Sequence, residues 1–275
     1  MISAIQKEED GTITLTITIP WKDIDEARRQ TIESLGRETE LPGFRKGKAP
    51  KNLIEEKLDP QLVRDETLRK LLPKYYLEAV ADHKLNPIIS PLIHVQNFED
   101  GKDWQFTAKT AEPPKIDLGG YKDSIKKITA KSKIIVPGKE TQSTSFGDIA
   151  KELLGAAKFS IPKIIVDREV ERLLAQFLDE VRRLGLTLDQ YLASSGKTVE
   201  NLRAEQEAKA ANDIKLELIL QKIAEDEKIE VSDKEIEDAI KNAKTPQERQ
   251  NLETNKYLLA SIIRQQKTLE FLRSL

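Results

Sequence analysis

Residues 12–19 read Thr-Ile-Thr-Leu-Thr-Ile-Thr-Ile, and this strict alternation of polar and apolar side chains constrains the fold more than any other feature of the chain. A period of two places all the apolar side chains on one face of a strand. Asp10-Gly11, a pair favoured in tight turns, directly precedes it, so residues 2–8 are predicted to pair with residues 12–19 as a hairpin. A second Asp-Gly pair, at 100–101, separates the runs 92–98 and 103–110, which predicts a second hairpin.

Helical patterns fill the rest of the chain. Between the hairpins we expect helices over 21–38, 50–58 and 61–84, with a kink or short break at Pro73. The fold class is therefore α+β: an N-terminal antiparallel sheet with helices, followed by an elongated all-α C-terminal domain with arm-like helices. The predicted domains are 1–112 and 161–275, and 113–160, which is rich in Pro, Gly and polar residues, is predicted to be a connector with a short helix over 147–157.

The predicted C-terminal helices have identifiable ends. Apolar residues recur at three- and four-residue steps from 162 to 184, and Gly185 is predicted to end that helix. Shorter and longer helices are expected over 187–194 and 198–225. Ser232-Asp233-Lys234-Glu235 is a capping box that opens 233–243, and Thr245-Pro246-Gln247-Glu248 is predicted to open the last helical region.

Composition excludes several classes of protein. The 275 residues carry 45 Lys+Arg against 47 Asp+Glu. A protein that coats nucleic acid needs an excess of basic residues, which this chain lacks. There is no Cys and there are two His, so disulfides, thiolate catalysis and a three-His metal site are excluded, and we expect neither metal nor cofactor. Residues 1–10 contain no apolar run and no stretch is long enough to span a bilayer, so we expect a soluble cytoplasmic protein without a signal peptide or membrane contact.

No arrangement of residues predicts catalysis. A catalytic site needs a nucleophile with a base, a carboxylate pair or a metal cluster, and none occurs with suitable spacing. Phosphate-binding glycine loops are absent as well, since Gly43 and Gly47 fit neither of the usual patterns. The sequence therefore favours a protein that is not an enzyme.

The segment Leu41-Pro42-Gly43-Phe44-Arg45-Lys46-Gly47-Lys48-Ala49-Pro50 is the most distinctive of the chain. It concentrates positive charge around one aromatic residue between glycines. On composition alone, either this is a basic turn with Phe44 folded into its own domain, or Phe44 enters an apolar pocket of a partner while Arg45 and Lys46 neutralise an acidic or phosphate surface. The second interpretation predicts a modest, salt-sensitive contact.

This segment resembles the ribosome-docking signature of bacterial trigger factor. Tyr75-Tyr76, residues 85–88 and the stretch 231–236 are similar to that family as well. The resemblance implies a cytoplasmic chaperone that docks on the large ribosomal subunit at the tunnel exit, contacts its protein and RNA, holds unfolded nascent polypeptides and can form a homodimer off the ribosome. Carried over, the anchor is the following set: Gly43, Phe44, Arg45, Lys46, Gly47 and Lys48.

The sequence departs from the family in one respect. Members usually carry an FKBP-like prolyl isomerase domain between the two regions, and here only residues 115–160 are available, with few aromatic residues to line a proline pocket. We therefore expect no isomerase activity. The competing enzyme hypothesis is a proline isomerase with a cryptic site in 115–160.

Clients are expected to be held by apolar residues of the long C-terminal helices, because burial of apolar surface is non-directional. The predicted contact positions are Ile165, Leu174, Leu178, Leu258 and Ile262. Each of them has the alternative of packing between helices. A further alternative for the whole protein is a ribosome-independent holdase or assembly chaperone for folded partners.

Overall fold

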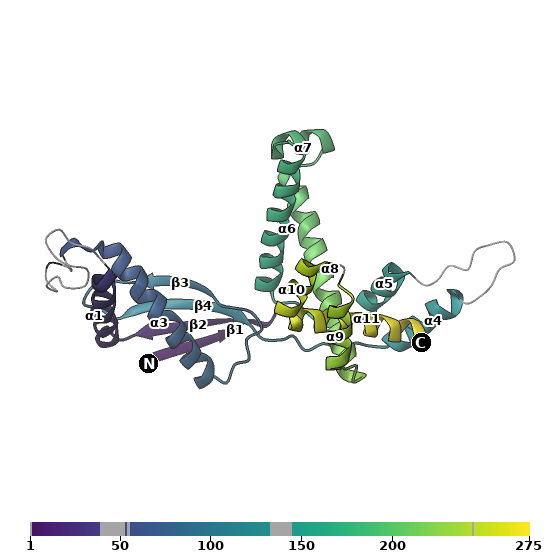
Figure 1. Cartoon of the computed structure of the whole chain (residues 1–275), viewed down its shortest axis with the longest axis horizontal. Helices are drawn as coiled ribbons and strands as arrows, with labels where there is room; N and C mark the ends of the chain where they lie inside the picture. The colour runs from purple at the N-terminus through teal and green to yellow at the C-terminus, as the bar shows by residue number, and fades with distance from the viewer. Residues whose placement is uncertain (1, 39–52, 54–55, 133–144, 244) are drawn as a thin grey trace. The chain divides into compact units, whose positions relative to one another are not determined.

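The structure is a computed structural model that describes residues 2–38, 53, 56–132, 145–243 and 245–275. The chain divides into two compact units, shown in Figure 1. The first unit comprises residues 1–113 together with 162–165, and the second comprises 114–161 together with 166–275. The predicted α+β class is confirmed: a four-stranded antiparallel sheet with helices forms the N-terminal part, and the C-terminal part is helical.

The sheet consists of the two predicted hairpins. Strands β1 (Ile2–Lys7) and β2 (Thr12–Ile19) form one, and β3 (Leu92–Asn97) and β4 (Trp104–Ala111) form the other. The strand order is β1-β2-β4-β3, so β2 and β4 are central and pair antiparallel with each other. Both Asp-Gly turns use the glycine at positive φ, +91° at Gly11 and +80° at Gly101, where a side chain would be disfavoured.

One face of the sheet is the core of the first unit. The apolar side chains of β2 are almost completely buried, as their alternation predicts. Helices α1 (Trp21–Glu38) and α3 (Pro60–Asp82) pack against each other, and their apolar residues share a buried cluster with β2 and β4. The buried members of this cluster include Ile13, Leu15, Ile17, Ile19, Ile24, Leu71, Tyr75, Tyr76, Trp104 and Phe106.

Helix α3 continues through Pro73 without the break that the sequence allowed. Leu71 precedes the proline, Tyr75 and Tyr76 follow it, and all three are buried in the core. Their packing on both sides of Pro73 offsets the local cost of a proline inside a helix.

The described part of the segment after the sheet contains the short helix predicted over 147–157 and one further helix that was not predicted. Helices α4 (Tyr121–Ser132) and α5 (Phe146–Ala156) pack against each other and against α8 (Val199–Asp226) and α11 (Lys256–Ser274). Residues 114–161 thus belong to the second unit. Their apolar residues join its main core, whose buried members are Leu118, Tyr121, Ile125, Ile149, Leu153, Ala157, Ile219, Leu220, Ile223 and Leu272.

A long helical hairpin forms the arm that the fold class anticipated. Helix α6 (Lys163–Arg183) runs out to the short helix α7 (Leu188–Ser195), and α8 returns beside α6 (Figure 1). Val170 and Leu173 of α6 pack against Ala210 of α8. Gly185 ends α6 at a φ of +75°, as predicted.

The last three helices follow α8. They are α9 (Asp233–Lys241), α10 (Pro246–Thr254) and α11. The capping box of Ser232 and Glu235 is present as predicted, and the hydroxyl of Thr245 accepts a hydrogen bond from the Glu248 backbone. The predicted last helical region is divided at Asn255, where α10 ends and α11 begins.

Candidate functional site

The predicted anchor lies outside the part of the chain that the structure describes. Gly43, Phe44, Arg45, Lys46, Gly47 and Lys48 fall between α1 and α3, as does most of the predicted helix 50–58. At the near end of α3, Asp59 accepts a hydrogen bond of 2.9 Å from the Gln61 backbone and Pro60 occupies the first turn. The assignment of residues 43–48 to ribosome binding therefore stays a prediction.

A hollow of about 370 Å³ lies between α1, α3 and the β3–β4 hairpin of the first unit. Its walls include Ile32, Val63 and Trp104, and the guanidinium of Arg64 stands 4.7 Å from the centre of the Phe98 ring. The sequence pattern did not predict a role for Phe98, because the alternation of β3 ends before this residue. The walls combine aromatic side chains with side chains of both positive and negative charge.

A larger groove, of about 580 Å³, lies in the second unit between α8 and α11. Residues 229–231, which connect α8 to α9, form one of its walls. Apolar and polar side chains share the lining. The residues that line it are Glu217, Leu220, Gln221, Ala224, Ile229, Glu230, Val231, Tyr257, Ala260, Ser261, Arg264, Gln265 and Thr268.

The turn at the end of α8 brings this wall back over the helix. Lys228 adopts the left-handed conformation at a φ of +53°. The amide of Lys228 donates to the Glu225 carbonyl over 3.2 Å, and that of Ile229 donates to the Ala224 carbonyl over 2.8 Å. This pair of bonds defines a Schellman ending, which satisfies the last carbonyls of the helix and reverses the chain.

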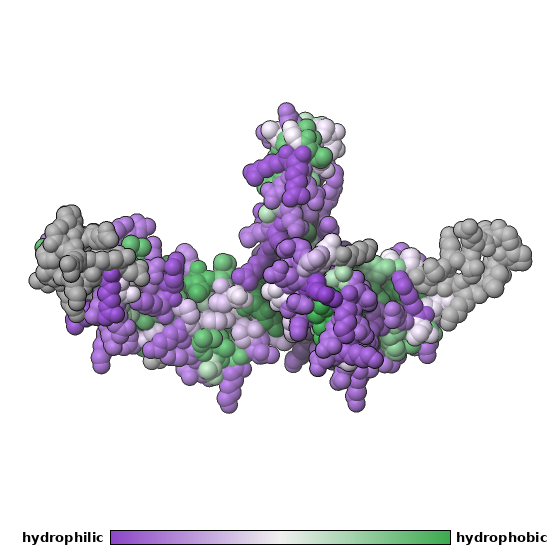
Figure 2. Space-filling model, in the orientation of Figure 1, coloured by the Kyte–Doolittle hydropathy of each residue, from purple (hydrophilic) through white to green (hydrophobic). Residues whose placement is uncertain are grey.

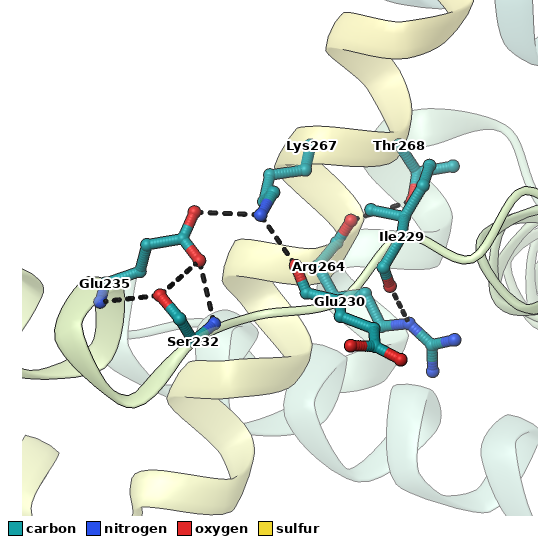
Figure 3. Close-up of polar contacts among 7 residues, drawn as sticks. All are labelled: Ile229, Glu230, Ser232, Glu235, Arg264, Lys267 and Thr268. Atoms are coloured by element: carbon teal, nitrogen blue, oxygen red, sulfur yellow. Dashed lines mark hydrogen bonds and ion pairs between the residues drawn. The ribbon is translucent and has the colours of Figure 1, made fainter.

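Two side chains of α11 hold the wall (Figure 3). The Nε of Arg264 donates to the Ile229 carbonyl over 3.0 Å. The ammonium of Lys267 donates to the Glu230 carbonyl over 2.6 Å and to the Glu235 carboxylate over 2.8 Å. Because Lys267 and then the backbone and hydroxyl of Ser232 bind this carboxylate, the pKa of Glu235 falls from 4.5 to about 2.

Exposed apolar side chains extend from the groove along α11. Tyr257, which lines the groove, is 92% exposed, and Leu258 and Ile262 are 60% and 43% exposed. Large apolar residues at such exposure are available to a partner. Tyr257 was not predicted. A signal for it was present in the sequence, since it directly precedes Leu258, but periodicity alone does not reveal which face of a helix lacks a neighbour.

The other predicted contact positions are half-buried. Leu174 packs against the small core between α6 and α8, and Leu178 lies one turn farther along α6. Ile165 belongs by its contacts to the first unit. The α7 end of the hairpin has hydrophobic surface in Figure 2. The exposed large apolar residues of this part of the chain are Leu184, Leu186 and Val199.

The described residues contain neither a cluster of metal-binding side chains nor a helix that could span a membrane. Among them, no three or more His, Asp or Glu side chains come together in a way that could hold a metal ion. None of the helices that the structure describes is both long and apolar enough to cross a membrane.

Comparison with known proteins gives two family matches that together span nearly the whole chain. The family described as "Bacterial trigger factor protein (TF)" matches residues 1–141, and "Bacterial trigger factor protein (TF) C-terminus" matches residues 138–274. The two matches adjoin, and no FKBP-like domain is found between them.

Individual relatives agree. Trigger factors from Staphylococcus epidermidis and Natranaerobius thermophilus are 32% and 30% identical over 122 residues, which is 44% of this chain but 28% and 27% of theirs. The match to the trigger factor of Staphylococcus carnosus, at 33% identity, also spans 28% of that relative. The matched region is thus a little over a quarter of each relative's length.

A solved structure resembles the whole chain in fold. It is described as "Promiscuous Substrate Recognition in Folding and Assembly Activities of the Trigger Factor Chaperone", and it aligns over 100% of this chain and 99% of its own with a TM-score of 0.63 at 14% identity. Such low identity shows the fold alone. The family matches define a class of proteins with an N-terminal and a C-terminal trigger factor region. Within that class, the chain belongs to the bacterial trigger factor family.

Proposed function

We propose that this protein is a ribosome-associated chaperone of the cytoplasm. The loop 43–48 docks on protein and RNA of the large ribosomal subunit near the tunnel exit, and the groove between α8 and α11 holds apolar segments of the emerging chain. The observation that carries the client-binding part is the groove with Tyr257, Leu258 and Ile262 exposed on the same helix. The docking part is supported by the loop sequence within a chain of this family.

The energetics of such a groove suit transient holding. Burying one exposed Leu or Ile side chain contributes about 1.5–3 kcal/mol. Ordering a flexible client offsets part of that gain. A micromolar affinity, about −8 kcal/mol, would be weak enough to permit release of the client.

Ribosome docking is tested by co-sedimentation of the wild type and of Phe44→Ala/Arg45→Ala/Lys46→Ala with ribosomes across a salt series. The wild type is expected to pellet with ribosomes, and to do so less as salt screens the contact. The triple variant is expected to stay in the supernatant. Equal pelleting of both proteins would remove the anchor.

Client holding is tested by the suppression of aggregation of an unfolded reporter protein. Leu258→Ser/Ile262→Ser should weaken it, because the apolar contact area of α11 is lost. Leu77→Ser is the matched control, since Leu77 is 63% exposed but lies on α3 in the first unit. Holding that survives mutation of residues 43–48, together with no association of the wild-type protein with ribosomes at all, would favour the ribosome-independent holdase.

The proposal includes no prolyl isomerase activity. The family matches adjoin near residue 140, and the described part of 114–161 contributes α4 and α5 to the helical core. A proline-peptide assay is expected to show the uncatalysed rate. A rate clearly above the uncatalysed one would contradict this proposal and favour the proline isomerase hypothesis.

A further inference from the structure

The wall at residues 229–231 is a short connection between two helices that are each capped independently. On its amino-terminal side, the Schellman bonds of Lys228 and Ile229 end α8. On its carboxy-terminal side, Glu235 accepts from the Ser232 backbone over 2.8 Å and from the Ser232 hydroxyl over 2.9 Å, which begins α9. The hydrogen bonds that form these two caps do not involve α11, so they do not determine how far the wall lies from that helix.

Lys267 connects the wall to α11. Its ammonium binds the Glu230 carbonyl, a wall atom, and the Glu235 carboxylate, which belongs to the cap of α9. Lys267 stands outside the set of described residues that line the groove, so it acts on the groove through these two partners. Arg264 differs in this respect, because it binds the Ile229 carbonyl and also lines the groove.

We propose that Lys267 is a positioning residue for client binding, which fixes the wall at the spacing from α11 that admits an apolar side chain of the client. Glu235 is its second partner, which keeps the ammonium over the Glu230 carbonyl. The inference rests on the proposed function of the groove. It adds that the width of the groove depends on the polar contacts of Lys267 with Glu230 and Glu235, which we call the latch, and not on apolar packing alone.

The geometry separates this role from a role in folding. If the ammonium of Lys267 is removed, the Schellman bonds and the Ser232–Glu235 bonds are still made, so α8 and α9 keep their ends. Arg264 also continues to donate its 3.0 Å bond to the Ile229 carbonyl. The 2.7 Å bond from the Thr268 hydroxyl to the Arg264 carbonyl lies within α11 and is unaffected. What is lost is the hold on Glu230, at the middle of the wall.

The test measures the dissociation constant of the full chain for fluorescently labelled, reduced α-lactalbumin as the unfolded client. Lys267→Met removes a positive charge and Glu235→Gln removes a negative one, while glutamine keeps the capping acceptor. Both are expected to weaken binding in the same direction, by about three- to tenfold for Lys267→Met. Lys267→Arg, which keeps donors for both partners, should restore most of the affinity.

The matched control is Lys241→Met. Lys241 lies on α9 and pairs at 3.7 and 3.6 Å with Glu237 and Asp238, neither of which lines the groove. Its affinity for the client should equal that of the wild type. If both lysine variants weaken binding equally, or if Lys267→Met and Glu235→Gln act in opposite directions, the effect is one of net charge and the latch is wrong.

A groove-filling variant, Ala260→Trp, distinguishes failure of the latch from failure of the groove. Ala260 lines the groove and is half-buried. Ala260→Trp should abolish most client binding. In the Ala260→Trp background, Lys267→Met should reduce binding little further, whereas a general loss of stability would reduce it in either background. Normal binding by Ala260→Trp overturns the proposed groove. Loss in Ala260→Trp with normal binding by Lys267→Met, both folded by circular dichroism, overturns the latch alone.

Discussion

The hydroxyl of Tyr121 donates a hydrogen bond of 3.0 Å to the carboxylate of Glu227. The bond joins the first residue of α4 to the end of α8, which lie far apart in the sequence. Lys122 contacts the same carboxylate over 2.7 Å, and its hydrogen bond, with that of Tyr121, holds the pKa of Glu227 below its usual value. The segment that follows the sheet is thereby attached to the helical core by polar as well as apolar contacts.

Tyr121→Phe should lower the free energy of unfolding of the second unit by about 0.5–1.5 kcal/mol, because the hydrogen bond to Glu227 is lost while the ring stays buried. Urea denaturation followed by far-UV circular dichroism measures it. Tyr257→Phe, at a tyrosine that is almost fully exposed, is the control and should leave stability unchanged. Identical midpoints for both variants would show that the bond contributes nothing.

Leu153→Ala should be among the more damaging single changes in the second unit. Leu153 is fully buried against α8 and α11 residues, and such a truncation costs about 2–5 kcal/mol. Phe146→Ala, on the exposed face of the same helix, should cost about 0.5 kcal/mol or less. Because Trp21 and Trp104 both lie in the first unit, tryptophan fluorescence should report an unchanged transition there. A small effect of Leu153→Ala would mean that α5 is dispensable for this core.

The capped carboxylate of Glu235 predicts a pH dependence. Its folded-state pKa of about 2 lies below the ordinary 4.5, so its contribution to stability is fully present above pH 4.5 and is lost as the pH falls toward 2. Carboxyl-resolved NMR titration measures this pKa directly. In Lys267→Met the pKa should rise but stay below 4.5, because Ser232 still donates to the carboxylate. A normal pKa in the wild type would contradict the latch geometry.

Two lysines occupy backbone conformations that favour glycine. Lys84 ends α3 at a φ of +52° and Lys228 ends α8 at +53°. Replacing either by glycine should raise the free energy of unfolding of its unit by about 1 kcal/mol, since the left-handed conformation is unfavourable for a side chain. Urea denaturation of each unit tests this, with tryptophan fluorescence for Lys84→Gly and circular dichroism for Lys228→Gly.

Alanine substitutions provide the controls for those two changes. Lys84→Ala and Lys228→Ala remove the long side chain without removing the backbone penalty, so they should leave stability near that of the wild type. Gly185→Ala should act in the opposite direction and cost about 1 kcal/mol, because its φ of +75° is penalised although nothing lies within 4 Å of the added methyl group. If Lys228→Gly and Lys228→Ala raised the free energy of unfolding equally, the gain would come from removing the lysine side chain and not from relieving the backbone conformation.

Much of the local structure could be predicted from the sequence. The alternation at 12–19 and the two Asp-Gly pairs predicted the hairpins, and Gly185 and Ser232–Glu235 predicted helix ends, because each depends on residues close together in the chain. The prediction was weaker at Pro73, where buried neighbours stabilise a helix that the proline alone would interrupt. It missed α4, whose apolar positions Tyr121 and Ile125 are too few to stand out in a polar segment.

The sequence alone determined the class of fold, the positions of most strands and helices, and the loop signature that is typical of the trigger factor family. Only the tertiary structure decided that α4 and α5 join the helical core and that a groove exists between α8 and α11. It also decided that Leu258 and Ile262 are exposed while Leu174 packs inside the arm. The physical reason is that periodicity tells which residues share a face of a helix. Whether that face meets another helix, a wall such as 229–231 or solvent depends on contacts between residues distant in the sequence.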